Sequence, residues 1–131
     1  MIDDYLALIP AAGVGARAQL STAKQFLKIG EKTILEHAID PFIKDENCKK
    51  ICVVTNEEDD LWPSLGISDH EKITSCFGGS TRMNSVLAGL ELLIDLEDKS
   101  SLVAIHDAAR PCLQIEDLKT LMEYADEEIK E

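Results

Sequence analysis

A glycine-rich loop with two cations follows the first apolar run of the chain, and it is the first place where chemistry is expected. The apolar residues 5–9 lead into Pro10-Ala11-Ala12-Gly13-Val14-Gly15-Ala16-Arg17, and Lys24 follows seven residues later. The formal net charge is −12, yet no Asp or Glu lies between Asp4 and Glu31. Small residues let backbone N–H groups approach phosphate oxygens, and cations neutralise the charge there. The loop therefore predicts a polyphosphate site.

The same loop matches the dinucleotide-binding pattern G-x-G-x-x-A at residues 13–18, but its surroundings do not fit a NAD or FAD site. That pattern needs a helix that starts inside the loop and leads to a second strand. Residues 19–28 carry no apolar stripe, and the first long helical pattern begins near Thr33. We therefore favour a phosphate-binding loop, and a glycine-rich turn with a purely structural role stays open as the alternative.

A second segment, Gly78-Gly79-Ser80-Thr81-Arg82-Met83-Asn84-Ser85, joins an apolar run to a helical pattern. Its glycines would let a flat nucleobase approach the backbone, and the Ser85 hydroxyl could read the polar edge of that base. The alternative is a turn with a helix cap at Ser80 or Thr81. Arg82 stands in the first helical turn, where the helix dipole disfavours a cation. We therefore expect a specific partner for Arg82, in the protein or in a ligand.

A third segment, His106-Asp107-Ala108-Ala109-Arg110-Pro111, places three ionisable groups directly after an apolar run. A carboxylate beside a phosphate-binding loop suits Mg²⁺, which proteins bind through one or two carboxylates and substrate phosphates. Asp107 is therefore a candidate magnesium ligand. The structural alternative is an ion pair between Asp107 and Arg110. We expect His106 to be a hydrogen-bonded structural residue and assign it no chemistry.

Short apolar runs that alternate with helical patterns have to position these segments. Strands are predicted at residues 5–9, 51–55, 73–77 and 102–105, and a short extended piece is predicted at 24–29. Helices are predicted at residues 33–44, at 57–65, from Ser80 or Thr81 onward and from 115 onward. Such alternation indicates an α/β fold with a mostly parallel sheet covered on both faces. Ligands then bind at the carboxyl ends of the strands, where all three segments fall.

The helical patterns also predict caps, breaks and buried faces. Thr33 and Glu36 fit a capping box. Pro41 is expected to kink or end the first helix, and Pro63 to break the second. The apolar positions expected on the last two helices are Val86, Leu87, Leu90, Leu93 and Ile94 on one, and Leu118, Leu121, Met122 and Ala125 on the other.

The composition indicates a single globular domain. The chain has 131 residues, of which 45% are apolar and 29% charged, and no apolar run approaches the roughly 20 residues that span a bilayer. The acidic start does not resemble a targeting peptide, so a cytoplasmic location is expected. The net charge of −12 disfavours a broad nucleic-acid or membrane surface. The cysteines Cys48, Cys52, Cys76 and Cys112 have no paired CxxC spacing, which predicts buried free thiols rather than zinc ligands.

The three segments together resemble the 2-C-methyl-D-erythritol 4-phosphate cytidylyltransferases of the non-mevalonate isoprenoid pathway. The matching pieces keep the family's order and spacing from residue 5 to about 122, and they read PAAGVGAR, KQFLKIGEKTILEHAI, GGSTRMNSVLAGL and HDAARPC. Ribitol 5-phosphate cytidylyltransferases resemble the chain over the same span, but they tend to carry an AGG loop where this chain has Pro10-Ala11-Ala12-Gly13. The isoprenoid family is therefore favoured, and the ribitol enzymes are the alternative.

The resemblance implies a Rossmann-like nucleotidyltransferase fold, which is a three-layer sandwich. It also implies transfer of the cytidylyl group of CTP to 2-C-methyl-D-erythritol 4-phosphate, with Mg²⁺ as cofactor and pyrophosphate as the second product. Arg17 and Lys24 would stabilise the transition state. Contacts with the nucleotide would come from Pro10, Ala11, Ala12, Gly13, Gly15 and Ala108, and contacts with its cytosine from Gly79, Ser80 and Ser85. Asp107 would bind the metal and meet the ribose or the substrate. Arg110 would bind the sugar phosphate across the interface of a homodimer.

Some positions depart from the family pattern. Ala16 and Ala18 stand where many members carry Arg and Met, Ala23 replaces a common Pro, and Ser80 replaces a frequent acidic residue. Members of the family also continue well beyond residue 131, with a dimerisation arm and further strands. Residues 1–131 are therefore expected to form the nucleotide-binding portion of one cytidylyltransferase domain, truncated at its C-terminal part. A CTP-binding fragment without activity is the alternative.

Overall fold

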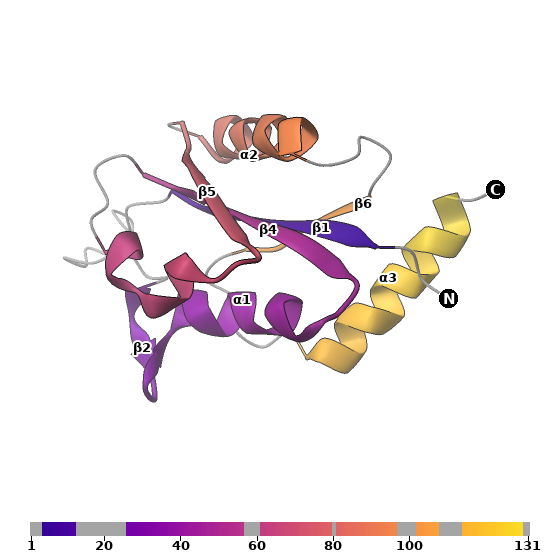
Figure 1. Ribbon diagram of the computed structural model, residues 1–131, viewed down its shortest axis with the longest axis horizontal. Coiled ribbons are helices and arrows are strands. Elements are labelled where there is room, and N and C mark those ends of the chain that lie inside the picture. Colours follow the sequence, from indigo (N-terminus) through magenta and orange to yellow (C-terminus); the bar gives the residue numbers. More distant parts are fainter. Residues whose placement is uncertain are drawn as a thin grey trace.

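Four parallel strands form the sheet on which the described part of the chain is built. The computed structural model describes residues 4–12, 26–56, 61–79, 81–96, 102–107 and 114–129. The elements in chain order are β1 (Tyr5–Ala11), β2 (Lys28–Ile29), β3 (Lys32–Thr33), α1 (Ile34–Lys44), β4 (Cys48–Thr55), β5 (Ile73–Phe77), α2 (Arg82–Leu96), β6 (Leu102–Ile105) and α3 (Ile115–Ile129) (Figure 1).

The strand order of the sheet is β5-β4-β1-β6, and every neighbouring pair is parallel. β1 lies between β4 and β6, with Ala7 opposite Ile51 and Leu8 opposite Ile105. A strand in this position is covered on both faces, which explains why its sequence is continuously apolar rather than alternating. The predicted parallel sheet is confirmed, and each of the four predicted strands is present.

Helices cover both faces of the sheet, so that the molecule has three layers. α2 packs on one face against β1, β4 and β5, while α1 packs on the other face against β1 and β4 and also contacts α3 (Figure 1). Successive side chains of a strand point to opposite faces. Tyr5, Ala7 and Ile9 therefore enter the larger core under α1, while Leu6 and Leu8 enter the smaller one under α2.

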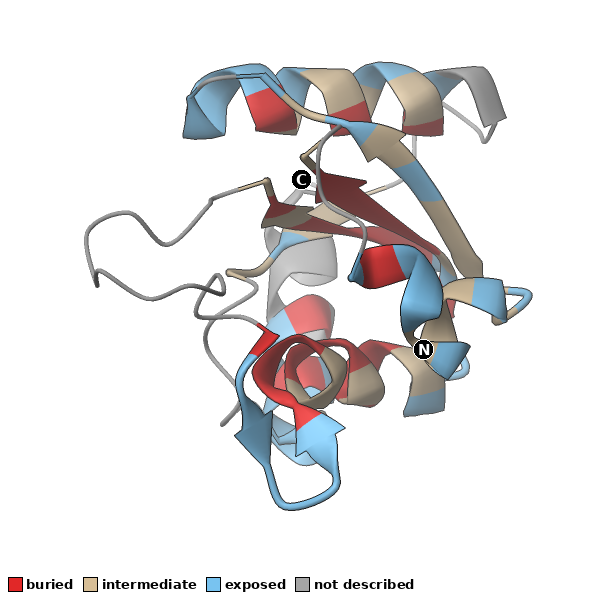
Figure 2. Cartoon of the chain, turned by 90° about the vertical axis from the view of Figure 1, so that its left-hand side faces the viewer, coloured by how far each residue is buried: buried red, intermediate tan, exposed pale blue. Residues whose placement is uncertain are grey.

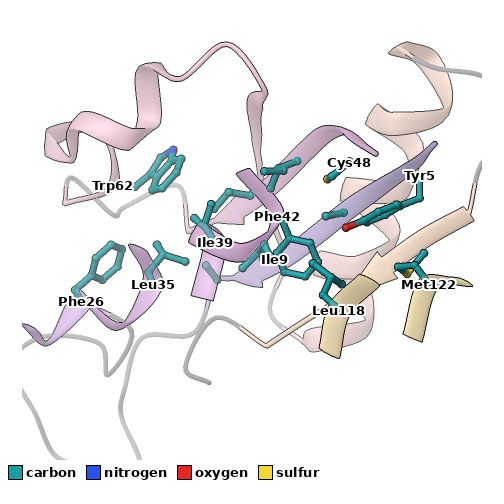
Figure 3. Packing of buried hydrophobic residues seen from close by; sticks show 14 residues of the cluster. Tyr5, Ile9, Phe26, Leu35, Ile39, Phe42, Cys48, Trp62, Leu118 and Met122 are labelled. Atoms are coloured by element: carbon teal, nitrogen blue, oxygen red, sulfur yellow. The ribbon is translucent and has the colours of Figure 1, made fainter. Parts of the chain in front are cut away.

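The larger core joins residues from distant parts of the chain. Figure 3 shows Phe42 of α1 between Ile9 of β1 and Leu118 of α3. Phe26 and Trp62 lie at the other end of the same cluster, near Leu35 (Figure 3). Figure 2 shows the burial that results: the central strands β1 and β4 and the helix sides that face them are mostly buried, β5 and β6 are mostly intermediate, and the β2–β3 hairpin is mostly exposed.

α1 begins and ends as its local sequence dictates, with one exception. Thr33 Oγ1 accepts a hydrogen bond of 3.1 Å from the Glu36 backbone N–H, and Glu36 Oε1 accepts one of 3.0 Å from the Thr33 backbone N–H. This is the predicted capping box. The helix continues through Pro41 to Lys44, so the expectation that this proline ends it is wrong. Burial of Phe42 in the core outweighs the single hydrogen bond that Pro41 cannot donate.

α2 packs against the sheet through a small residue. A Cβ atom on Gly89 would lie 2.5 Å from Leu8 Cδ1 and 2.9 Å from Val54 Cγ2. The buried stripe of the helix therefore runs through Ser85, Gly89 and Leu93. The expectation that Leu87 and Ile94 are core residues is wrong, since they are 51% and 47% exposed.

Two other expectations about helices are also corrected. Leu118 and Met122 of α3 are buried as predicted, but Leu121 is 59% exposed because it lies at the edge of the buried stripe, about 100° around the helix from Met122, and the side chain of Ala125 lies outside the described set. The helix predicted at residues 57–65 is replaced, from residue 61 onward, by two 3₁₀ turns at Trp62–Ser64 and Gly66–Asp69. Pro63 favours such a short turn because it cannot donate a helical hydrogen bond.

The extended piece before Gly30 is shorter than predicted among the described residues. β2 covers Lys28–Ile29 and pairs antiparallel with β3. Gly30 turns the chain between them with a φ of 71°, in the left-handed region that glycine enters without strain. Residues 24 and 25 lie outside the described part of the chain.

A buried polar cluster closes the end of the sheet at which β1 begins. The Tyr5 hydroxyl donates a hydrogen bond of 2.8 Å to Asp45 Oδ2, and the Asn47 backbone N–H donates one of 3.1 Å to Asp45 Oδ1. Lys72 Nζ donates to the carbonyl oxygens of Ile43 and Asp45, at 3.0 Å each. Burial and the hydrogen bond to Asp45 raise the pKa of Tyr5 above its ordinary value.

The cysteines that the structure describes are free thiols, as predicted. Cys48 and Cys52 are buried, Cys76 is half-buried, and Cys112 lies outside the described residues. Burial raises the pKa of Cys48 and of Cys52 to about 12. Within the described ranges, no group of three or more His, Cys, Asp or Glu side chains could hold a metal ion. None of the helices described is both long and apolar enough to cross a membrane.

Candidate functional site

A cavity of about 250 Å³ lies where the three predicted segments meet. Three parts of the described chain line it. They are the end of β1, the turn between β5 and α2 together with the first turn of α2, and Asp107, which lies two residues after β6. The lining residues are Pro10, Ala12, Gly79, Thr81, Arg82, Ser85 and Asp107. Residues up to 97 positions apart in the sequence thus share one wall, as the carboxyl ends of parallel strands allow.

The sheet topology explains why a cavity forms at this place. The connection from β1 to β4 runs through α1 on one face, whereas α2 leads to β6 over the other face. In the order β5-β4-β1-β6 the chain passes from β1 to β4 and β5 on one side and then crosses to β6 on the other side of β1, so the strand order reverses between β1 and β6. This is the switch point at which open α/β sheets bind ligands.

Gly78 brings the turn after β5 against the end of β1. Its backbone N–H donates a hydrogen bond of 2.8 Å to the Thr55 carbonyl oxygen. A Cβ atom at this position would collide with Ser85 Oγ and would lie 2.8 Å from Val54 Cγ1 and 3.0 Å from the Ala12 Cβ. A larger residue would push the turn away from the strands, so the close approach of this turn requires glycine.

Thr81 caps α2 and places Ser85 at the cavity. Thr81 Oγ1 accepts a hydrogen bond of 3.1 Å from the Asn84 backbone N–H, and the Thr81 carbonyl oxygen accepts one of 3.1 Å from the Ser85 backbone N–H. The cap expected at Ser80 or Thr81 is therefore made by Thr81. Ser85 is buried one turn into the helix, and it is among the lining residues.

Arg82 and Asp107 form an ion pair in the cavity wall. Arg82 Nη2 lies 3.2 Å from Asp107 Oδ1, and the two side chains are 62% and 44% exposed. The structure thus provides the partner that the position of Arg82 in the first helical turn predicted. The structural alternative for Asp107, an ion pair with Arg110, is not tested, because Arg110 lies outside the described residues. The place of Arg82 in the site was missed, although the cation at a helix start was a usable signal.

His106 lies on the other side of β6 from Asp107. Its ring packs against Phe42 of α1, with the ring centroids 5.8 Å apart and the planes at 53°. Its backbone N–H donates a hydrogen bond of 3.1 Å to the Leu8 carbonyl oxygen and continues the β1–β6 ladder. These contacts agree with the structural role expected for His106.

The remaining predicted site residues divide into two groups. Ala11 is buried and is not part of the cavity lining, while the backbone carbonyl of neighbouring Ala12 accepts a hydrogen bond of 3.4 Å from Asn56 Nδ2. The others lie outside the described part of the chain: Gly13, Gly15, Arg17, Lys24, Ser80, Ala108 and Arg110. The structure therefore brings together the strand end, the base-pocket candidates and the candidate metal ligand, and it does not describe the two predicted catalytic cations.

Curated relatives match nearly the whole chain. A protein of Actinobacillus pleuropneumoniae serotype 5b (strain L20) is 42% identical over 128 residues, which are 98% of this chain and 54% of that protein. One of Vibrio atlanticus (strain LGP32) is 38% identical over 124 residues, which are 95% of this chain and 53% of that protein. Both are named 2-C-methyl-D-erythritol 4-phosphate cytidylyltransferase. The chain spans about half the length of the curated relatives it matches.

Solved structures agree with the three-layer nucleotidyltransferase fold. The crystal structure of a 4-diphosphocytidyl-2C-methyl-D-erythritol synthase has a TM-score of 0.79 at 32% identity, over 95% of this chain and 55% of that one. The cytidylyltransferase of Francisella tularensis has a TM-score of 0.73 at 36% identity, over 93% of this chain and 52% of that one. The family profile for 2-C-methyl-D-erythritol 4-phosphate cytidylyltransferase matches residues 5–130. The chain therefore belongs to the 2-C-methyl-D-erythritol 4-phosphate cytidylyltransferase family.

Proposed function

We propose that this chain forms the nucleotide-binding part of an enzyme that transfers the cytidylyl group of CTP to 2-C-methyl-D-erythritol 4-phosphate. The products are 4-diphosphocytidyl-2-C-methyl-D-erythritol and pyrophosphate. The observation that carries the proposal is that all three segments line one and the same cavity. Pro10 and Ala12 come from the first segment, Gly79 and Ser85 from the second, and Asp107 from the third. Membership of the family supports the same reaction.

The proposed reaction needs no protein nucleophile. A phosphate oxygen of the erythritol substrate attacks the α-phosphorus of CTP in line and forms the new P–O bond. The bond from the α-phosphorus to the oxygen that bridges to the β-phosphate breaks, and pyrophosphate leaves with that oxygen. Catalysis then consists of positioning and of charge stabilisation. We assign the stabilising charges to Arg17 and Lys24, as the resemblance to the family implies, since both cations belong to the acid-free stretch that follows β1.

The turn after β5 suits the base of the nucleotide. Gly79 is exposed and lines the cavity, so a planar ring can approach its backbone. A Cβ atom on Gly79 would lie 2.5 Å from the Cβ of Asn84, so the turn tolerates no larger residue there. The Ser85 hydroxyl lies in the same wall, and it can donate to or accept from a polar base edge. We therefore place the cytosine between this turn and the start of α2.

Asp107 fits the role of a magnesium ligand. Mg²⁺ in nucleotide sites is held by one or two carboxylates together with substrate phosphates and water. The described wall offers one carboxylate, Asp107, which is half exposed and faces the cavity with the hydroxyl-bearing Thr81 and Ser85. One carboxylate is enough where the triphosphate supplies the other ligands. The bound metal would neutralise charge on the phosphates during the transfer.

The proposed assembly is a homodimer in which Arg110 reaches the sugar phosphate of the partner's site, as the resemblance to the family implies. The cytoplasm supplies CTP, and we therefore place the reaction there. Sedimentation velocity tests the assembly directly.

Pyrophosphate release is the decisive measurement. The protein is incubated with CTP, Mg²⁺ and 2-C-methyl-D-erythritol 4-phosphate, and in parallel with ribitol 5-phosphate. Faster release with the erythritol phosphate supports the proposal, while faster release with ribitol 5-phosphate identifies the alternative enzyme. Calorimetric binding of CTP without release with either acceptor identifies a CTP-binding fragment. Binding of NAD without any response to CTP would overturn the nucleotidyltransferase assignment altogether.

A further inference from the structure

Arg82 contributes a cation to the cavity wall at a position where a helix does not favour one. It is the first residue of α2, at the end of the helix where the backbone N–H groups point and the helix dipole is positive. The helix dipole disfavours a cation at this end. Its guanidinium lies 3.2 Å from Asp107 Oδ1, across 25 residues of sequence. This contact compensates for the unfavourable position, and it links the two walls of the cavity.

The two partners differ in how firmly the fold holds them. α2 is fixed by the Thr81 cap and by the close approach of Gly89 to Leu8. Asp107 lies two residues beyond the last β6 residue, next to His106, whose backbone N–H continues the β1–β6 ladder. The orientation of an aspartate carboxylate is set by its two side-chain torsions, χ1 and χ2. An arginine on a fixed helix can therefore set the orientation of the carboxylate.

We propose that Arg82 is a positioning residue for nucleotidyl transfer: its guanidinium holds the Asp107 carboxylate at the cavity wall in the orientation that meets the nucleotide. This inference rests on the proposed function. Arg82 acts through Asp107, and it also offsets the negative charge of that carboxylate in a cavity that has to accept a triphosphate. A planar guanidinium constrains a carboxylate more closely than an ammonium group does.

A double-mutant cycle tests the inference on the full chain. Arg82→Gln, Asp107→Asn and the double variant are compared in kcat/KM, in the Mg²⁺ concentration that gives half-maximal rate, and in CTP affinity by calorimetry. Arg82→Gln is expected to lower kcat/KM by about 10–100-fold. Losses of this size are typical when a residue that hydrogen-bonds to a metal ligand and orients it is removed. It should also raise the Mg²⁺ requirement. In the Asp107→Asn background the same change should have less than a threefold effect.

Two further variants separate positioning from charge alone. Arg82→Lys keeps the charge but loses the planar fork, so its rate should lie between those of the wild type and Arg82→Gln. A matched control is the ion pair of Asp4 and Lys49, which is 3.5 Å long, similarly exposed and located where β1 and β4 begin. Lys49→Gln makes the same change in net charge as Arg82→Gln, and it should leave kcat/KM and the Mg²⁺ requirement unchanged.

The pair can also be observed without turnover. The guanidinium of Arg82, held by Asp107, should show slowed rotation and separate Nη signals in ¹⁵N NMR spectra, and Asp107→Asn should merge them. If the wild type is active and Arg82→Gln lowers kcat/KM equally in the wild-type and Asp107→Asn backgrounds, the inference is overturned while the proposed function stands. A wild type that neither binds CTP nor releases pyrophosphate would overturn the proposed function, and the inference with it.

Discussion

The Tyr5 hydroxyl group donates a hydrogen bond of 2.8 Å to Asp45 Oδ2, and both side chains are fully buried where the central strand begins. This contact joins β1 to the turn between α1 and β4. It lies at the opposite end of β1 from the cavity, so it contributes to the stability of the scaffold and not to the site.

Tyr5→Phe is expected to lower the free energy of unfolding by about 1–3 kcal/mol, because Asp45 then loses a donor in a buried position. Urea unfolding measures the change. Ser64→Ala is the control, since it removes an exposed hydroxyl that donates to the Leu61 carbonyl oxygen. That variant should change the unfolding free energy by less than about 0.5 kcal/mol. Equal losses in the two variants would show that burial of the Tyr5 contact is not what matters.

Alkaline pH should destabilise the protein through its buried thiols. The pKa of Cys52 rises to about 12 on folding because the thiol is buried, while an unfolded thiol ionises at about 8.5. A group whose pKa is raised on folding contributes stability that is present below its unfolded pKa and lost as pH rises towards its folded pKa. Each such thiol therefore lowers the free energy of unfolding by about 1.4 kcal/mol for each pH unit between its unfolded and its folded pKa.

Cys52→Ala removes one of these thiols and should flatten the alkaline slope. The difference in unfolding free energy between wild type and variant is measured by urea unfolding at pH 8, 9, 10 and 11. It should shrink by about 1.4 kcal/mol for each pH unit above 9. A difference that stays constant over this range would mean that Cys52 is not kept protonated by the fold.

Gly89→Ala is expected to destabilise the protein, although alanine is the better helix former by about 1 kcal/mol. The added Cβ would lie 2.5 Å from Leu8 Cδ1, and overpacking of this kind costs about 1–3 kcal/mol. The double variant Gly89→Ala/Leu8→Val, which makes room for the methyl group, should recover part of the loss. Gly66→Ala is the control, because nothing lies within 4 Å of a Cβ at that position. Thermal unfolding that ranks Gly66→Ala as the worse variant would contradict this account of how α2 packs.

Arg17→Ala and Lys24→Ala should each reduce turnover by about 10²–10³-fold if these residues stabilise charge in the transition state. The effect is expected mainly in kcat, with a smaller change in CTP affinity, since charge accumulates during the transfer. Lys28→Ala is a matched control, because Lys28 belongs to the same acid-free stretch but is exposed on β2. Near-normal kcat in both site variants would exclude this mechanism.

The sequence predicted the strands, their parallel pairing and the meeting of three segments at one edge, because each depends on local patterns. A continuous apolar run such as residues 5–9 indicates a central strand, and capping by Thr33 is decided within four residues. The faces of α2 and the partner of Arg82 depend on tertiary contacts. A pattern of apolar residues cannot show that Gly89 is the contact point, which left Leu87 wrongly assigned to the core.

The pairing register of β1 and β6 decides which of the side chains that follow β6 faces the cavity. Leu8 lies opposite Ile105, and this register directs Asp107 towards Arg82 and His106 towards Phe42. A slip of β6 by one residue would move it by about 3.3 Å along β1 and would turn each of its side chains to the opposite face of the sheet. An imidazole would then stand where the carboxylate now stands, and a charged group would enter the core. The identity of the acidic group in the cavity is thus a property of strand alignment as well as of sequence.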